Sequence, residues 1–139
     1  MDRQTVLEFV KRHPVSHMAT VEDGRPRVRA MQTAIADEAG LTFCTGSHKD
    51  VARQLRADPS VELSYWDPDD GRQIRIRGDV EQLDDVALKT QVVEQVFTFL
   101  KPVVKDHGYD AISLFRLSHG EIRVWDRATG HAAPNASPF

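Results

Sequence analysis

Residues Leu41–Leu55 read Leu-Thr-Phe-Cys-Thr-Gly-Ser-His-Lys-Asp-Val-Ala-Arg-Gln-Leu, and the fold is organised around this stretch. The apolar residues before Gly46 predict a short strand, and the residues after it predict a helix. Ser47 is the expected N-cap of that helix, and Asp50 three residues later completes a capping box. Free N–H groups, the helix dipole and the ammonium of Lys49 would together favour an anion such as a phosphate. An ordinary capped helix with a solvated lysine is the alternative interpretation.

The composition is that of one folded domain. The chain has 139 residues, of which 40% are hydrophobic and 28% charged, as in a globular rather than a disordered protein. Its net charge of -3 gives no general reason to expect nucleic acid or an acidic membrane as partner. Cys44 is the only cysteine, which excludes an intramolecular disulfide and a cysteine-rich zinc site. With no apolar signal core and no run of ~18 apolar residues, a cytoplasmic protein is expected.

Alternation of apolar and polar residues predicts several short strands. Asp23-Gly24 is a strong hairpin-turn signal, and the strands on either side of it continue into Leu41–Cys44 as an expected three-strand meander. The other expected elements are a helix capped by Thr5 and Glu8, the helix after Lys49, strands at 61–65 and 73–80, a helix from Asp84 with an apolar stripe of Val86, Val93, Val96, Phe97 and Leu100, and a hairpin of 112–117 with 122–125. This pattern predicts an α+β fold with an antiparallel sheet or barrel. Residues 131–139 are small, polar and proline-bearing, and are expected to form a frayed tail.

Neither metal binding nor acid–base catalysis has a clear sequence signature. The histidines show no paired spacing typical of a metal site. They are His13, His17, His48, His107, His119 and His131. Cys44 ends an apolar strand, where a buried structural cysteine is expected. The carboxylates occur in turns and helix caps, where those local roles account for them.

Arginines are the more informative group. Arg25, Arg27 and Arg29 alternate along one strand, while Arg72, Arg75 and Arg77 lie close together on another. Guanidinium groups suit phosphate and carboxylate ligands, because their N–H donors form a planar fork. Exposed strand arginines paired with Asp and Glu are an equally good interpretation. Combined with Lys49, the arginines favour an anionic ligand.

The order of the motifs resembles the pyridoxamine-phosphate-oxidase-like, flavin-binding split-barrel family, especially its branch of nitroimidazole-resistance-type proteins. The resembling segments are His13–Val15, Met18–Val21, Asp23–Arg29, Phe43–Val51, Gln54-Leu55, Asp58–Leu63, Arg72–Gly78 and Phe115–Ile122. No single segment is diagnostic, but their order and spacing over nearly the whole chain are specific.

This resemblance implies a six-stranded antiparallel split β-barrel with flanking helices, formed by residues 1–130, that dimerises and binds FMN between its subunits. By resemblance, Arg29 and Lys49 contact the FMN phosphate, Ala30, Met31 and Gln32 border the isoalloxazine ring, Cys44 and Thr45 lie beside the cofactor, and Gln73 reaches it from the partner subunit. A flavin oxidoreductase needs no catalytic acid or base of its own, because the cofactor performs the redox chemistry.

Three points remain open at this stage. The chain ends at Phe139, without the tryptophan- and arginine-containing segment that shapes the vitamin site of the oxidase, so oxidation of pyridoxamine phosphate itself is not expected. A deazaflavin is one alternative cofactor, with an anionic tail bound by arginines of the two basic strands. A cofactor-free or haem-binding module for sensing or sequestration is the other, with His17, His48 or His119 as axial ligand.

Overall fold

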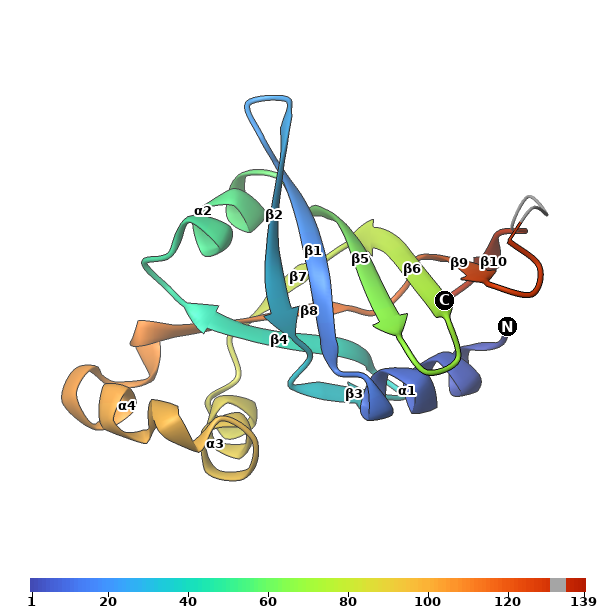
Figure 1. The fold of residues 1–139 in the computed structure, drawn as a ribbon. Coiled ribbons are helices and arrows are strands. Elements are labelled where there is room, and N and C mark those ends of the chain that lie inside the picture. Colours follow the sequence, from blue (N-terminus) through green and yellow to red (C-terminus); the bar gives the residue numbers. More distant parts are fainter. Residues whose placement is uncertain (131–134) are drawn as a thin grey trace.

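The strands form two antiparallel sheets in the computed structural model, which describes residues 1–130 and 135–139 (Figure 1). One sheet has the strand order β10-β9-β6-β5-β1-β2, and the other has the order β3-β4-β8-β7. The strands are β1 (Val15–Glu22), β2 (Arg25–Gln32), β3 (Ile35–Asp37), β4 (Gly40–Gly46), β5 (Ser60–Asp67), β6 (Arg72–Asp79), β7 (Glu81–Leu83), β8 (Ile112–Leu117), β9 (Glu121–Asp126) and β10 (Ser137–Pro138). The helices are α1 (Arg3–Arg12), α2 (Asp50–Ala57), α3 (Val86–Gln95) and α4 (Lys101–His107), with 3₁₀ turns η1 (Thr98–Leu100) and η2 (Tyr109–Ala111). The predicted α+β class is confirmed.

Alternation in the long strands places their apolar side chains in a core between the two sheets. Ile74 and Ile76 of β6 are fully buried, whereas Arg77 on the opposite face is exposed, as the sequence pattern predicts. Met18 of β1 and Leu63 of β5 extend the same buried row. Helix α1 contributes four apolar side chains to this core.

The predicted hairpin at Asp23-Gly24 forms, but the predicted meander does not. Asp23 and Gly24 both have positive φ, 52° and 73°, in the turn between β1 and β2. Strand β4 pairs with β3 and β8 rather than with β2, so the meander was wrong. The chain changes sheets at Thr33-Ala34, whose N–H groups donate to Pro14 O beside β1 and to Thr42 O in β4. The hydrogen bond of Thr33 is thus made to the six-stranded sheet, and that of Ala34 to the four-stranded sheet. Strand β2 therefore ends, and β3 begins, at these two residues.

The predicted final hairpin is also wrong. Strand β8 pairs with β4 and β7, whereas β9 pairs with β6 and β10. Residues 118–120 carry the chain from one sheet to the other. A Cβ on Gly120 would lie 2.3 Å from Arg77 O, so glycine permits this close crossing. Strand β7, which the sequence analysis did not predict, completes the second sheet.

Two helix caps differ from their predictions. Helix α1 is capped by Asp2, whose carboxylate accepts from the Thr5 N–H at 2.8 Å. Ser47 does not cap α2, because its hydroxyl donates instead to Asp110 O at 2.6 Å. Lys49 occupies the N-cap position, without a side-chain hydrogen bond to the helix. The predicted capping box at α2 is therefore wrong.

The predicted apolar stripe from Asp84 onward is only partly helical. Helix α3 is capped by Asp85 and ends at Gln95, so Phe97 and Leu100 lie beyond it. Val86 is 56% exposed, whereas Val93 is buried as expected. No helix in residues 1–130 and 135–139 is long and apolar enough to cross a membrane.

The end of the chain packs against the large sheet. Ser137 and Pro138 pair with β9, and Phe139 is buried beneath the Arg3 guanidinium, 4.2 Å from its ring centroid. A buried aromatic ring and a strand pairing hold these residues, so the structure corrects the expectation of a frayed tail for this part. Residues 131–134 of the expected tail lie outside the described residues.

Candidate cofactor-binding site

A cavity of about 290 Å³ lies where the edge strand β2 meets the end of β4 and the turn between α3 and α4. Seven of the eight predicted site residues line it. They are Arg29, Ala30, Met31, Gln32, Cys44, Thr45 and Lys49. The remaining lining residues are Gly46, Val51, Phe97, Phe99 and Leu100. The cavity thus has cationic groups, strand backbone and an apolar wall, and its lining contains no carboxylate.

Hydrogen bonds to β1 and to helix α2 hold the guanidinium of Arg29 in place. Its Nη1 donates to Thr20 Oγ1 at 2.7 Å and to Met18 O at 3.3 Å, and its Nη2 donates to Gln54 Oε1 at 2.5 Å. Partial burial lowers the pKa of Arg29, while the carboxylates of Asp50 and Glu22 act in the opposite direction. The guanidinium stays charged, because its ordinary pKa is far above neutrality.

Lys49 lies in the loop that joins β4 to α2. Its N–H donates to Gly46 O, and its own carbonyl accepts the first bond of the helix from Arg53 N–H. The side chain is exposed. Among residues 1–130 and 135–139, neither Lys49 nor Arg29 makes an ion pair with a carboxylate.

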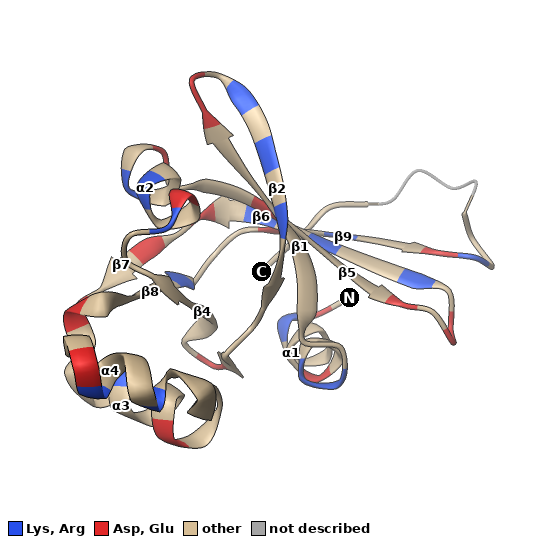
Figure 2. Ribbon diagram, turned by 60° about the vertical axis from the view of Figure 1, so that its left-hand side comes forward, with Lys and Arg blue, Asp and Glu red and all other residues tan. Residues whose placement is uncertain are grey.

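The other predicted arginines are mostly in ion pairs. Figure 2 shows the basic bands along β2 and the charges of both signs on β6 and β9. The pairs are Arg27 with Glu22, Arg72 with Asp70, Arg75 with Glu62, and Arg77 with Glu121. For these four the alternative interpretation, exposed arginines paired with carboxylates, is confirmed. Arg29 differs from them because its bonds go to neutral acceptors.

A second hollow of about 570 Å³ adjoins the first, and Arg29, Lys49 and Val51 line both. Its further lining includes Arg27, His48 and Asp50. The two hollows therefore place cationic side chains at their common boundary. A ligand whose anionic group binds at this boundary could extend into the first cavity or into the second hollow.

The surroundings of Cys44 do not favour a reactive, nucleophilic thiolate. Burial raises the pKa of its thiol to about 11, although the ammonium of Lys89 acts in the opposite direction. Reactive cysteines have lowered pKa values, since the thiolate is the nucleophile. The structural role expected for Cys44 agrees with this chemistry.

Gln73 lies away from the cavity. It is on β6, three strands from β2 in the sheet, which is ~14 Å at the usual strand spacing. Its Nε2 donates to Ser64 Oγ at 3.0 Å, and its sheet neighbours are Trp66 and Trp125. Gln73 therefore does not line the cavity of its own chain.

Five lining residues and two supporting ones were not predicted as site residues. Phe97 belonged to a stripe interpreted only as core, and Phe99 had no signal except that it lies between Phe97 and Leu100 of that stripe. Phe99 is 72% exposed beside the cavity, with its ring centroid 5.8 Å from that of Phe97. Thr20 has no signal in the sequence, and the contacts of Thr20 and Gln54 with Arg29 depend on tertiary packing.

The histidines do not gather at one place. His48 lines the second hollow, whereas His17 is on β1 and His13 pairs with Asp67 at 3.2 Å. His131 lies outside the described residues. In the described part of the chain, no group of three or more His, Cys, Asp and Glu side chains could hold a metal ion.

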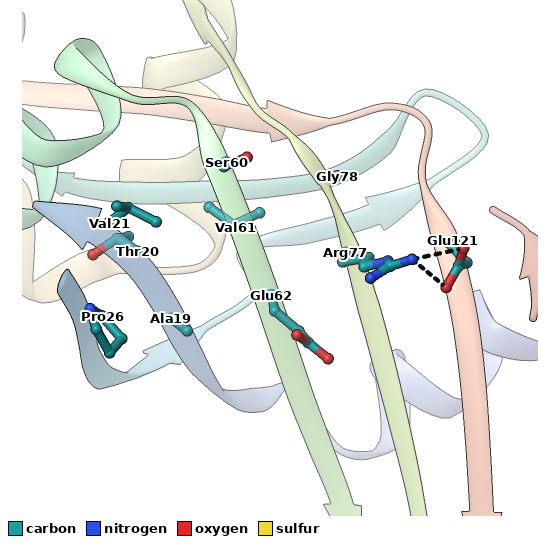
Figure 3. A pocket seen from close by; sticks show the side chains of 10 residues that line it. All are labelled: Ala19, Thr20, Val21, Pro26, Ser60, Val61, Glu62, Arg77, Gly78 and Glu121. Carbon is teal, nitrogen blue, oxygen red and sulfur yellow. Dashed lines mark hydrogen bonds and ion pairs between the residues drawn. The ribbon is translucent and has the colours of Figure 1, made fainter. Parts of the chain in front are cut away.

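A separate hollow of about 440 Å³ lies on the outward face of the six-stranded sheet (Figure 3). Ala19, Val21 and Pro26 provide apolar surface, and the ion pair between Arg77 and Glu121 stands at one side. It contains none of the predicted site residues. Because it is broad and shallow on an open sheet face, it suits a protein surface better than a cofactor.

Two sheets of six and four strands, joined by short connections that cross from one sheet to the other and flanked by helices, define a split-barrel protein. The family model for pyridoxamine 5'-phosphate oxidase matches residues 3–126. The chain therefore belongs to the pyridoxamine 5'-phosphate oxidase family, and the predicted resemblance is confirmed. A pyridoxine/pyridoxamine 5'-phosphate oxidase from Ectopseudomonas mendocina is 40% identical over 67 residues. That match spans 48% of this chain and 31% of the relative's length.

Solved structures agree with the fold. A NimC/NimA family protein from Clostridium acetobutylicum has a TM-score of 0.76 at 24% identity, over 99% of this chain and 92% of that chain. An F420 reductase has a TM-score of 0.59 at 26% identity, over 78% and 87% of the two chains. A heme binding protein from Mycobacterium smegmatis has a TM-score of 0.72 at 15% identity, over 97% and 57%. The predicted split-barrel fold is thereby confirmed.

Proposed function

We propose that this protein is an FMN-binding oxidoreductase, with the cofactor in the cavity between β2, β4 and the α3–α4 turn. The observation that carries the proposal is the pair of cations at this cavity, Arg29 and Lys49, which have no carboxylate partner among the described residues. Charged groups without a partner are costly unless solvent or a ligand satisfies them. A phosphate monoester would supply both charge and hydrogen-bond acceptors.

The lining fits the rest of a flavin as well. Ala30 and Gln32 lie on a strand at the edge of its sheet, whose outer backbone groups are free to bond a ligand. Met31, Phe97 and Leu100 offer apolar surface to a flat ring. A bound flavin would supply the hydride or electron transfer. The residues of the chain bind its phosphate, orient the ring and exclude water from one side.

The proposal includes a homodimer with the cofactor near the subunit interface. The cavity of one chain, about 290 Å³, is at the lower end of the usual range for a ligand site. Gln73 is on the outward face of the large sheet, too far from its own cavity. A two-fold partner could complete the site with this face, since an isologous interface presents each surface twice. The substrate would be a small molecule.

The proposal also places the protein in the cytoplasm, without a nucleic-acid or membrane partner. The net charge of -3 and the single cysteine support this location.

The test is the visible spectrum of the purified protein together with its thermal unfolding. We expect a flavin absorbance, or, for protein purified without cofactor, stabilisation on adding FMN. At a hundredfold excess over the dissociation constant, binding contributes about 2.7 kcal/mol to the free energy of unfolding. Protein without flavin absorbance that FMN does not stabilise would contradict the proposal.

A deazaflavin is the second candidate cofactor. The hollow beyond Arg29 and Lys49 carries Arg27 and His48, which could hold a longer anionic tail. The likeness to an F420 reductase at 26% identity supports the same alternative. Competition between FMN and the deazaflavin decides between them, and tighter binding of FMN counts against the alternative.

A haem-binding or cofactor-free role is the remaining alternative. The fold is shared with a heme binding protein, but at 15% identity that likeness concerns the fold alone. His48 is the histidine beside the candidate site. Haem titration that gives a Soret band, lost in His48→Ala, would favour this role over FMN.

A further inference from the structure

Gln54 is a polar residue on the buried face of a helix. Its neighbours on that face of α2 are Val51, Ala52 and Leu55, and Gln54 itself is only 3% exposed. A buried amide is destabilising unless it is hydrogen-bonded, so an apolar side chain would be expected at such a position. The hydrogen bonds of Gln54 to Glu22, Thr20 and Arg29 indicate a role other than packing in the core.

The hydrogen bonds around Gln54 fix the orientation of its amide. Gln54 Nε2 donates to Glu22 Oε2 at 3.1 Å. A hydrogen bond from Arg53 lowers the pKa of Glu22, so this carboxylate is ionised at neutral pH and can only accept. The NH₂ group must therefore face Glu22, and the carbonyl oxygen Oε1 must face the other way. There it accepts from Thr20 Oγ1 at 2.6 Å and from Arg29 Nη2 at 2.5 Å.

Arg29 is thus oriented by neutral groups. Its two terminal nitrogens donate to the Thr20 hydroxyl and to the Gln54 carbonyl, and both of these side chains are at most 3% exposed. A carboxylate in place of Gln54 would orient the guanidinium equally well but would also neutralise it. An amide and a hydroxyl fix its geometry and leave its positive charge for a ligand. The guanidinium has five N–H donors, and Nε–H and one Nη2–H remain beyond these bonds.

We propose that Gln54, oriented by Glu22, is a positioning residue that aims Arg29 at the phosphate of the cofactor and so gives the site its preference for a phosphorylated flavin. The inference rests on the proposed function. It concerns the selectivity of the site for phosphate, because Gln54 acts on a ligand only through the Arg29 guanidinium.

The experiment compares the dissociation constants of FMN and riboflavin, which differ only in the phosphate. Gln54→Met keeps the volume and removes both amide groups. We expect it to weaken FMN binding about tenfold, the size of effect that losing an orienting partner of a ligand-binding group produces. Riboflavin affinity should stay within about twofold, since it makes no phosphate contact.

Gln82→Met is the matched control. Gln82 Oε1 also accepts from an arginine, Arg56 Nε at 3.3 Å, but Gln82 lies on β7 and does not line the cavity. This variant should bind both flavins as the unmodified protein does. In an Arg29→Ala background, Gln54→Met should produce no further loss of FMN affinity, because its route of action has been removed.

Thr20→Val removes the other side-chain acceptor of Arg29 at nearly constant volume, and we expect the same selective loss of FMN affinity. It provides the test if Gln54→Met does not fold. Equal weakening of FMN and riboflavin would show a merely structural role and overturn the inference, as would unchanged FMN affinity in both variants. Unmodified protein that binds neither flavin would instead contradict the proposed function, on which the inference depends.

Discussion

Lys49 and Arg29 differ in how firmly they are held, although both line the cavity. Arg29 has three hydrogen bonds within the chain, whereas Lys49 is exposed at the start of α2. A preorganised group loses less conformational entropy when it binds a ligand. Arg29 therefore suits geometric recognition of a phosphate, and Lys49 suits a simpler contribution of charge.

Replacing either cation by alanine should weaken FMN binding. A hydrogen bond to a charged group contributes about 1.5–3 kcal/mol, so Lys49→Ala and Arg29→Ala should each raise the dissociation constant about tenfold or more. Isothermal titration with FMN measures the change. Lys11→Ala, on the exposed side of α1, is the control for the loss of one positive charge. If FMN affinity is unchanged in both site variants, the ligand or its location has been misidentified.

Cys44 should be unreactive at neutral pH and should destabilise the fold at high pH. With a pKa of about 11, its thiolate fraction at pH 8 makes alkylation roughly two orders of magnitude slower than for a free cysteine. Its pKa in the folded state is above the ordinary thiol value of 9.0, so its contribution to stability is complete below pH 9 and is lost as pH rises toward 11.

The measurement is chemical unfolding between pH 8 and 11 for the unmodified protein and Cys44→Ala. The variant should lose less stability across this range. Burial also raises the pKa of Tyr65, but this tyrosine is present in both proteins and its effect cancels in the comparison. Rapid alkylation of the folded protein at pH 8 would show that Cys44 is more accessible than the structure indicates.

At the scale of the elements, the second sheet depends on a glycine at the turn between β3 and β4. Gly40 has a φ of +128°, and a Cβ there would lie 2.2 Å from Leu117 O on the neighbouring strand. Gly24, between β1 and β2, has a φ of +73° with open space around it. Both glycines have a positive φ, which is unfavourable to other residues, but they differ in their surroundings.

Gly24→Ala should cost about 1 kcal/mol of unfolding free energy, the usual penalty for a positive φ. Gly40→Ala should cost ~3 kcal/mol or more, because the same kind of strain adds to a clash with backbone. Urea denaturation of both variants measures the difference. Equal losses would indicate that the turn moves easily away from β8, and that the close packing of the two sheets at this point is not required.

The sequence predicted the faces of the strands better than their partners. Alternation identified the buried side of β6, Ile74 and Ile76, and the turn signal at Asp23-Gly24 identified the hairpin of β1 and β2. It failed for residues 118–120, because alternation specifies which side chains are buried and not which strand lies alongside. A short connection was interpreted as a hairpin, yet it joins the two sheets.

For the candidate site, too, the sequence predicted some residues and missed others. Arg29 and Lys49 followed from motif order, which carries information about position in a known fold. Gln54 and Phe99 depend on how α2 and the α3–α4 turn pack against β2 and β4. Single-sequence patterns have no access to such contacts, since they arise between segments far apart in the chain. Polar residues on an otherwise apolar helix face are the signal that could have found Gln54.

For the whole molecule, the outward face of the six-stranded sheet is one surface on which large apolar side chains are exposed in the described residues. The exposed apolar side chains on it span the sheet from β2 to β9. They are Val28 at 68%, Val15 at 53%, Trp66 at 44% and Trp125 at 36% exposed. The two tryptophan rings lie 6.3 Å apart, on either side of Gln73. Aromatic residues on an exposed face are typical of protein interfaces.

If this face forms the proposed dimer interface, a charge at Val28 should separate the subunits. Val28 is largely exposed in the single chain, so Val28→Glu should change the stability of a folded monomer by only about 0.5 kcal/mol. Buried in an interface, an unpaired carboxylate costs several kcal/mol, and the two-fold symmetry introduces it twice. Val86→Glu on α3, 56% exposed and away from this face, is the matched control.

Sedimentation of the unmodified protein and of Val86→Glu should give twice the chain mass of 15.7 kDa, whereas Val28→Glu should sediment as a single chain. The tryptophan emission of Val28→Glu should shift to longer wavelength, because Trp66 and Trp125 become exposed to water. FMN affinity should fall in the same variant, since the partner that brings Gln73 to the cavity is absent. A Val28→Glu protein that remains dimeric would place the interface on another face and leave Gln73 without a route to the cofactor.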